Sequence, residues 1–532
     1  MKYIYYLFCI GFFFSCKPEG DKKHQLISTW PNGITYEIFV QSFCDSNGDG
    51  IGDIPGMTQK LDYLQSLGIE AIWLMPINPS PSYHKYDVTD YYDIHPDYGT
   101  LDDFKSFVTA AHQRGIKVIM DLVINHSSDK HPWFVEAASD ISSPYRDYYV
   151  WADKDSIARQ IAKKETSFDS DNITQWHAAN GDTLGNHYYG FFTGMMPDFN
   201  FDNPQVRQEF YKIGRFWMEE IGVDGFRLDA AKHIYPDDRA GDNHAFWEEF
   251  RREMQTIKSD AYTVGEVWAN ATSTAEYTGG FSALFNFDLA FSILESVKKE
   301  EIVSASISGH GWKVAEKSFI IQLAENKKLF SARNPDFTDA VFLSNHDQNR
   351  YMSVLGNSPE KARLATAILF TLPGQPYLYY GEEIGMLGQK PDPNIREPFL
   401  WDTPEKDTTR TKWMEPVFTT DQTITPLSAQ QKDPHSLFNH YKNLIHLRRT
   451  NKALAFGDIT PIETGNKALV AFERSTQDTA ILVIHNLLGV SQNFERTGLS
   501  PDIKLVYGQA EVKGQSLQIP AYGSVVVGLT EH

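Results

Sequence analysis

The amino-acid sequence predicts an α/β protein built on a (β/α)8 TIM barrel, with a small domain inserted into the barrel and an antiparallel β-sandwich domain at the C-terminus. Three observations predict this architecture. Eight apolar runs of strand length alternate with helical patterns, one connection is too long for a simple loop, and short β-type runs follow the last helical pattern. A chain of 532 residues is also long enough for two or three domains.

The expected barrel strands are short runs rich in aliphatic and aromatic residues. Helical patterns lie between most of them, for example over Leu101–Arg114, Gln205–Ile221 and Lys361–Leu372, and the last barrel helix is expected over Leu437–Arg448. This alternation is typical of a parallel sheet closed into a barrel. The expected strands are Ile34–Val40, Ile69–Met75, Val118–Val123, Gly225–Ala230, Thr263–Val267, Leu284–Phe287, Val341–Ser344 and Tyr377–Tyr380.

The domain boundaries follow from the places where this alternation stops. The connection between Val123 and the helix near Gln205 is rich in Trp, Tyr, His, Asn and Asp, and its length predicts an inserted domain. Beyond the last barrel helix, turn residues separate the β-type runs Ala468–Phe472, Ala480–Ile484, Lys504–Tyr507 and Ser524–Gly528. We therefore expect the barrel over 30–124 and 204–452, the inserted domain over 125–203 and the sandwich over 453–532.

Composition and charge exclude some classes of partner. There are 49 Lys and Arg residues against 69 Asp and Glu residues, which gives a net charge of −20 and disfavours nucleic acid, because phosphate binding requires a basic surface. The binding of a neutral polymer does not depend on this net charge. The 41% apolar and 13% aromatic content is sufficient for a large core and argues against disorder.

The N-terminus has the pattern of an export signal. Lys2 precedes an apolar run from Tyr3 to Phe14, which is too short to span a bilayer comfortably, and Ser15-Cys16 follows. We expect a signal peptide over 1–15, lipidation of Cys16 at a sequence that resembles a bacterial lipobox, and a polar tether over 16–29. The protein would then be secreted across the inner membrane and lipid-anchored to the outer membrane or cell surface. The alternative is plain secretion with cleavage nearby. Three cysteines do not imply a disulfide framework.

An acidic residue ends the strand-like run that begins at Gly225. Arg227 and Asp229 are two positions apart, so in a strand their side chains point to the same face. A carboxylate beside a fixed guanidinium is held ionised, as a nucleophile must be. The alternative is an ordinary strand end with a surface ion pair.

Four further motifs occur in a fixed order around this one, and most are apolar runs that end in acidic, Asn or His residues. Together with Gly225–His233 they resemble the conserved regions of the α-amylase family of retaining glycoside hydrolases. The resemblance implies a barrel with an inserted domain B and a C-terminal domain C. The motifs are Asp121–His126, Met196–Asn200, Gly265–Trp268 and Phe342–Asp347.

The resemblance also implies the roles of three carboxyl groups. Asp229 would be the nucleophile, Glu266 the acid that protonates the leaving oxygen and later the base, and Asp347 would hold substrate hydroxyls and favour the distorted ring. We expect a raised pKa for Glu266, so that it is protonated near neutral pH, and an Asp229 kept charged by Arg227.

Other residues would bind substrate if the resemblance holds. His126 and His346 would donate hydrogen bonds to hydroxyls of the sugar that is cleaved, and Tyr86 would stack under the same sugar. The residue before this tyrosine is usually Gly in the family, whereas this chain has Lys85.

Two pairs of residues bear on which bonds are cut. Lys232 and His233 resemble the pair that lines the leaving-group side of the cleft in α-amylases, and Asp392 and Arg396 resemble a loop that grips the next sugar on the other side. Glucosidases that trim chain ends tend to carry Asp where this chain has Tyr83. These features favour an open cleft, although Met196–Asn200 is an intermediate version of its motif.

A glycine-rich acidic loop predicts a cation site. Oxygen-bearing side chains alternate along it, a backbone carbonyl is available, and this donor set suits a hard cation such as Ca²⁺. The loop is not an EF-hand because Gly56 stands where Glu would be required. Related family members bind Ca²⁺ or Mg²⁺ with this loop, while the alternative is an acidic turn without metal. The expected ligands are Asp45, Asn47, Asp49, the carbonyl of Ile51 and Asp53.

The sequence therefore predicts a retaining hydrolase that cleaves internal α-1,4-glucosidic bonds of starch and maltooligosaccharides. Within the same class, a neopullulanase, a cyclomaltodextrinase or a transglycosylating relative is the alternative. In a different class, the chain would be an inactive glucan-binding protein, but such proteins typically lose one or more of the three carboxylates, and all three are present here.

Overall fold

The computed structural model describes residues 26–161, 175–179, 186–309, 311–507 and 510–529. The predicted signal peptide, Cys16 and most of the tether lie outside these residues, whereas Cys44 is buried and its thiol is free. None of the described helices is long and apolar enough to cross a membrane.

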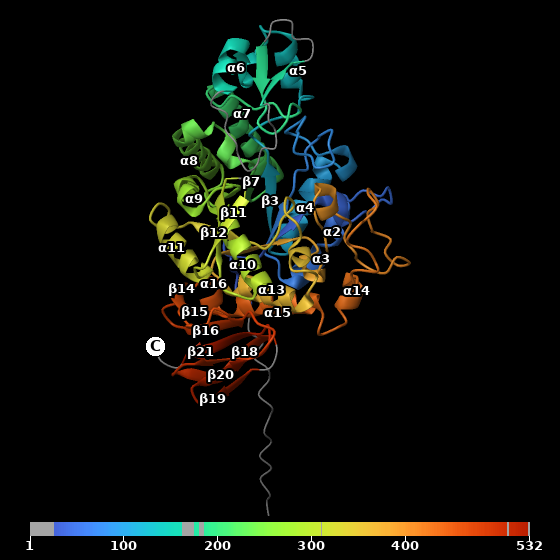
Figure 1. Cartoon of the computed structure of the whole chain (residues 1–532). Coiled ribbons are helices and arrows are strands. Elements are labelled where there is room, and N and C mark those ends of the chain that lie inside the picture. Colours follow the sequence, from blue (N-terminus) through green and yellow to red (C-terminus); the bar gives the residue numbers. More distant parts are fainter. Residues whose placement is uncertain (1–25, 162–174, 180–185, 310, 508–509, 530–532) are drawn as a thin grey trace, which may run out of the picture.

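Eight parallel strands close into a barrel in chain order, which confirms the predicted fold class (Figure 1). Each of the eight predicted runs overlaps one of these strands by at least one residue. The strands are β1 (Thr35–Ile38), β2 (Ala71–Leu74), β3 (Lys117–Leu122), β7 (Gly225–Leu228), β8 (Tyr262–Gly265), β9 (Ala283–Phe285), β12 (Thr338–Val341) and β13 (Gln375–Tyr379).

The prediction for the seventh barrel strand was wrong in its position. The strand runs over Thr338–Val341 and not over Val341–Ser344. Phe342 and Leu343 are apolar because they are buried beyond the end of the strand, whereas the strand itself begins with polar residues. Burial and strand pairing therefore do not coincide at this position.

Helices surround the barrel, and their sequences explain where they begin. At the start of α4, Thr100 and Asp103 form a reciprocal capping box, and the helix buries Phe104, Phe107 and Val108 on one face. The helices of the barrel and its connections are α1 (Val40–Phe43), α2 (Ile54–Gln59), α3 (Leu61–Leu67), α4 (Leu101–Gln113), α7 (Pro204–Arg215), α8 (Ala240–Ile257), α9 (Ala271–Tyr277), α10 (Phe287–Lys299), α11 (Phe319–Ser331), α12 (Tyr351–Val354), α13 (Pro359–Thr371), α14 (Leu427–Gln430), α15 (Leu437–Thr450) and α16 (Lys452–Phe456).

The long connection between β3 and α7 carries the small inserted unit at the top of Figure 1. It contains a three-stranded antiparallel sheet in the order β4-β6-β5. Its elements are α5 (Pro132–Ser139), β4 (Trp151–Asp153), α6 (Lys154–Ile161), β5 (Trp176–Ala178) and β6 (Asn186–Tyr189). A second feature, the hairpin of β10 (Ser304–Ser308) and β11 (Gly311–Ala315), follows α10 and was not predicted.

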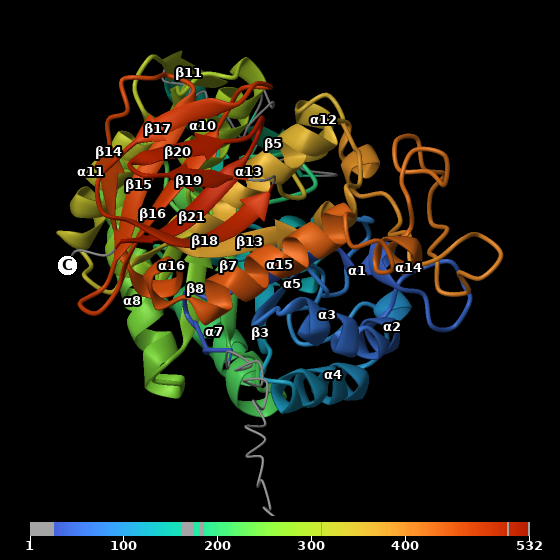
Figure 2. The ribbon, with the colours of Figure 1, turned by 90° about the horizontal axis from the view of Figure 1, so that it is seen from below.

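Two antiparallel sheets form the C-terminal sandwich, with an apolar core that includes Leu469, Leu482, Leu517 and Val525 (Figure 2). Four of its strands were missed because they are short or largely polar. The five-stranded sheet has β14 (Asp458–Ile462), β15 (Leu469–Ser475), β16 (Ala480–Asn486), β18 (Leu499–Tyr507) and β21 (Ser524–Leu529), and the three-stranded sheet has β17 (Gln492–Glu495), β19 (Glu511–Lys513) and β20 (Ser516–Ile519).

Candidate active site

The guanidinium of Arg227 lies at the centre of the site. This side chain of β7 is only 1% exposed and donates to three carboxyl groups. Its Nη1 lies 2.5 Å from Oδ1 of Asp229 and 3.1 Å from both oxygens of Asp121, and its Nη2 lies 2.5 Å from Oε2 of Glu266. Because strands β3, β7 and β8 are parallel neighbours, all four residues meet at the carboxyl-terminal end of the barrel.

Two backbone features bring Asp229 and Glu266 together. A Cβ atom at Gly225 would lie 2.0 Å from the carbonyl oxygen of Tyr262, so only glycine allows β7 to pair so closely with β8 at this point. After Asp229, Ala230 has a left-handed conformation (φ 45°, ψ 40°), and the next amide then donates to the carbonyl oxygen of Glu266. A non-glycine residue in this region carries strain of about 1–2 kcal/mol, a cost that is common at active sites.

Glu266 is held in the protonated form at neutral pH. Burial raises the pKa of its carboxyl to about 8; the Arg227 charge opposes this rise, and the Asp229 charge adds to it. The indole Nε1 of Trp268 donates to the other carboxyl oxygen at 2.8 Å. Trp268 was not among the predicted site residues, although an aromatic residue two positions beyond the acid was visible in the sequence.

Asp347 lies in a second group of charges that was only partly predicted. Its carboxylate contacts Nη2 of Arg396 and Nε2 of His346, each at 3.0 Å. Burial alone would raise the pKa of Asp347, but the positive charges of His346 and Arg396 hold it below its ordinary value. Asp392 also reaches Arg396, at 3.5 Å.

Glu37 explains why His346 carries a positive charge. The carboxylate of Glu37 on β1 lies 2.5 Å from Nδ1 of His346. Burial disfavours the charged imidazole, but Asp347 and Glu37 outweigh it and raise the pKa of His346 to about 10. Glu37 was not predicted as a site residue, although an acidic residue inside an apolar barrel strand is an unusual feature.

Tyr86 joins the two groups of charges. Its ring stacks on His346 with centroids 5.6 Å apart, and its hydroxyl lies 2.7 Å from Nε2 of His346 and donates to Asp121 at 3.1 Å. Lys85 adopts a left-handed conformation (φ 65°) that favours glycine, the residue that is usual at this position in the family. His126 lies beside this turn, with Nε2 3.2 Å from the carbonyl oxygen of Tyr86.

The inserted domain contributes two aromatic rings that were not predicted. Phe191 stacks on His233 with centroids 4.0 Å apart, and Phe192 packs edge-on against His126 at 5.4 Å. Lys232 is partly exposed and pairs with Asp237 at 3.2 Å. The structure therefore places His233 beside the inserted domain and Lys232 in an ion pair.

The predicted cation loop coils around Asp45. The carboxylate of this residue accepts the amides of Asn47, Gly48 and Gly50 at 2.7–3.1 Å, and Asp53 accepts the amide of Ser46 at 2.9 Å. Within the described ranges, no three His, Cys, Asp or Glu side chains are gathered as a metal cluster. A hard cation here would therefore depend on Asn47 and the Ile51 carbonyl as well as on carboxylates, and such a mixed oxygen set fits Ca²⁺.

Comparison with known proteins identifies the family. The profile described as "Alpha amylase, catalytic domain" matches residues 37–457. The chain belongs to the α-amylase family. It is therefore an α-amylase family glycosidase, and the family implies an α-glucan substrate. The profile "Alpha-amylase SusG C-terminal domain" matches residues 469–526, within the C-terminal sandwich.

Similar proteins in this family have more than one activity. The chain is 43% identical to Alpha-amylase 3 of Dictyoglomus thermophilum, over 94% of this chain and 93% of that protein. It is 34% identical to a 4-alpha-glucanotransferase of Thermotoga neapolitana, over 88% and 98% of the two chains. The crystal structure of the α-amylase from H. orenii has a TM-score of 0.81 and 40% identity, and the match covers 94% of this chain and 99% of that one.

Proposed function

We propose that this α-amylase family glycosidase cleaves internal α-1,4-glucosidic bonds of starch and maltooligosaccharides with retention of configuration. The observation that supports it best is the shared guanidinium of Arg227, which contacts the carboxyl groups of Asp229 and Glu266 at 2.5 Å each. Burial raises the pKa of Glu266 to about 8, so its carboxyl holds a proton at neutral pH. A retaining glycosidase requires this pairing of one acid and one nucleophile.

The proposed reaction has two displacements. The Glu266 carboxyl gives its proton to the glycosidic oxygen while Asp229 attacks the anomeric carbon, so the leaving chain departs with the proton and the sugar remains esterified to Asp229. The ionised Glu266 then takes a proton from water, and the hydroxide oxygen displaces Asp229 from the anomeric carbon. Asp347, held by Arg396, would accept hydrogen bonds from the sugar hydroxyls.

Residues on both sides of the carboxyl groups support an open cleft. Tyr86, His126 and His346 would bind the sugar that is cleaved. On one side, Lys232 and His233 would line the leaving-group end, and on the other, Asp392 and Arg396 would bind the next sugar. The similarity to a 4-alpha-glucanotransferase favours transfer to another sugar as the second candidate, in which an acceptor hydroxyl replaces water in the second step.

Product analysis on two polymers tests this proposal. We expect the wild type to release mixed-length fragments from soluble starch early in the reaction. Asp229→Asn should lower this rate by at least about 1,000-fold, because the covalent route is lost. The measurement is reducing-end release with product lengths resolved over time.

The other outcomes identify the alternatives. Panose from pullulan would indicate a neopullulanase, longer products from a short donor would indicate a transferase, and glucose alone would indicate an exo-acting glucosidase. Starch binding without any release by the wild type would favour the inactive binding protein. Panose would contradict the restriction to starch and maltooligosaccharides, and each of the other results would contradict the proposed endo-hydrolysis.

We also propose that the loop over Asp45–Asp53 binds Ca²⁺ and stabilises the fold. EDTA should lower the melting temperature of the wild type and added Ca²⁺ should restore it, with about 2.7 kcal/mol of stabilisation at 100 times Kd. Asp45→Ala should abolish this response, whereas the exposed Asp62→Ala should retain it. A wild-type melting curve that is insensitive to both reagents would exclude the cation.

The match to a SusG C-terminal domain supports a location at the cell surface. We propose that the chain is exported and anchored through a lipid on Cys16. The full chain expressed in a bacterium should incorporate labelled palmitate into the membrane fraction, and Cys16→Ser should abolish the labelling. Equal labelling of the two proteins, or an unlabelled wild type, would contradict a lipid at this position.

A further inference from the structure

The unpredicted hairpin β10–β11 lies against α10 and outside it, at the edge of the barrel in Figure 2. Side chains alternate between the two faces of a strand, so neighbouring residues of β11 face opposite ways. Trp312 faces α10, whereas Lys313 lines a hollow on the other side of the hairpin. The two faces can therefore be tested separately.

Trp312 is an exposed aromatic ring with a fixed orientation. Its indole lies flat on Phe291, with centroids 4.2 Å apart and planes 8° from parallel, yet 42% of the residue is exposed. One face of the ring is thus held by a buried neighbour while the other is open to solvent. A flat apolar surface that is already ordered loses little entropy on binding, and it matches the apolar face of a sugar ring.

A row of aromatic rings connects Trp312 to the catalytic acid. Trp268 donates to Glu266, stacks on Phe287 with centroids 4.0 Å apart, and lies 6.4 Å from Phe291, which carries Trp312. Two ring contacts, Trp268 with Phe291 and Phe291 with Trp312, therefore link the ring beside Glu266 to the exposed indole.

A glucan fits this surface better than a protein partner does. A stable protein interface covers about 800 Å² on each partner, whereas the open part of one indole is roughly 100 Å². Val314 is the other exposed large apolar residue of β11. A patch of this size is enough for one or two sugar rings and too small for a protein interface.

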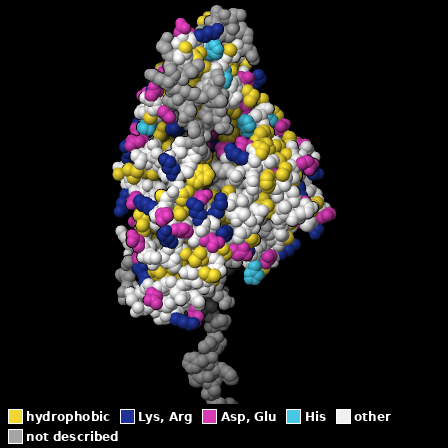
Figure 3. All heavy atoms as spheres, in the orientation of Figure 1, with side chains coloured by type: hydrophobic (Ala, Val, Ile, Leu, Met, Phe, Trp, Pro, Cys, Tyr) yellow, Lys and Arg dark blue, Asp and Glu magenta, His cyan; other side chains and the backbone are white. Residues whose placement is uncertain are grey.

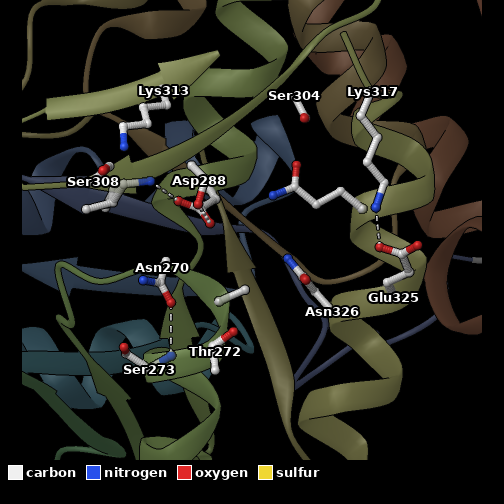
Figure 4. Close-up of a pocket in the computed structure, with 14 residues that line it drawn as sticks. Asn270, Thr272, Ser273, Asp288, Ser304, Ser308, Lys313, Lys317, Glu325 and Asn326 are labelled. Carbon is white, nitrogen blue, oxygen red and sulfur yellow. Dashed lines mark hydrogen bonds and ion pairs between the residues drawn. The ribbon is translucent and has the colours of Figure 1, made fainter. Parts of the chain in front are cut away.

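The hollow on the opposite face of the hairpin is less suited to a glucan (Figure 4). It encloses about 640 Å³, and its lining contains hydroxyl, amide and charged side chains but no aromatic ring. Some of its polar groups already have partners: Lys317 pairs with Glu325 at 2.5 Å, and Asp288 accepts the amide of Ile307 at 2.7 Å. Lys313 points into this hollow and provides a matched control on the same strand.

We propose that Trp312 is a carbohydrate-stacking platform that binds α-glucan outside the catalytic carboxyl groups and retains long substrates. The inference rests on the proposed function, because it takes an α-glucan as the ligand. The platform would act on chains that extend beyond the residues around Arg227. It would increase the affinity for polymers more than the affinity for short oligosaccharides.

Binding to soluble starch tests the platform. It is measured with full-length protein that carries Asp229→Asn, so that the ligand is not consumed. Trp312→Ala should weaken binding roughly tenfold, which corresponds to about 1.4 kcal/mol. Trp312→Tyr should retain most of the affinity because it keeps an aromatic face, and Lys313→Ala should bind like the parent. In enzyme with Asp229 intact, Trp312→Ala should lower the ratio of kcat/KM for starch to kcat/KM for maltotriose by a similar factor.

The outcomes separate this inference from the proposed function. Equal starch affinity of Trp312→Ala and its parent, or an equal loss in Lys313→Ala, would overturn the platform even if the wild type degrades starch. A wild type that does not hydrolyse starch but binds it through Trp312 would refute the proposed function and leave the platform standing. Melting curves of the three variants confirm that each is folded.

Discussion

The chemistry of this protein depends on one buried guanidinium that donates hydrogen bonds to three carboxyl groups. Arg227 contacts Asp121, Asp229 and Glu266, so one positive charge faces three potential negative charges in a site with little access to water. The three cannot all ionise without a large cost in a medium of low dielectric constant. Burial raises the pKa of two of them, to about 7 for Asp121 and to about 8 for Glu266, so Glu266 holds its proton to the higher pH.

A second set of charges fixes the residues around Asp347. Asp347 and Glu37 together keep His346 protonated, and His346 together with Arg396 keeps Asp347 ionised. The hydroxyl of Tyr86 bridges these groups to the carboxyl groups around Arg227. Since each charge is fixed by its neighbour and not by solvent, the polar groups are already oriented before a sugar binds, which is how enzymes stabilise developing charge at low cost.

The sequence predicted the features that depend on local pattern. Period-two alternation placed Arg227 beside Asp229, and the apolar runs located the barrel. Contacts between distant segments could not be predicted, such as Glu37 with His346 or Phe191 with His233, because no local pattern encodes them. The hairpin β10–β11 was missed because β10 is rich in serine and β11 has a lysine among its few apolar residues. The predicted position of β12 was wrong because burial extends beyond its last paired residue.

Titration of the Glu266 carboxyl tests the central claim most directly. Infrared difference spectra of the wild type against Glu266→Gln should show a protonated carboxyl at neutral pH that disappears as the pH rises through about 8. In Asp229→Asn the same carboxyl should ionise at lower pH, because the negative neighbour that raises its pKa is gone. A Glu266 that titrates near 4.5 in the wild type, or one that is unaffected by Asp229→Asn, would contradict the account.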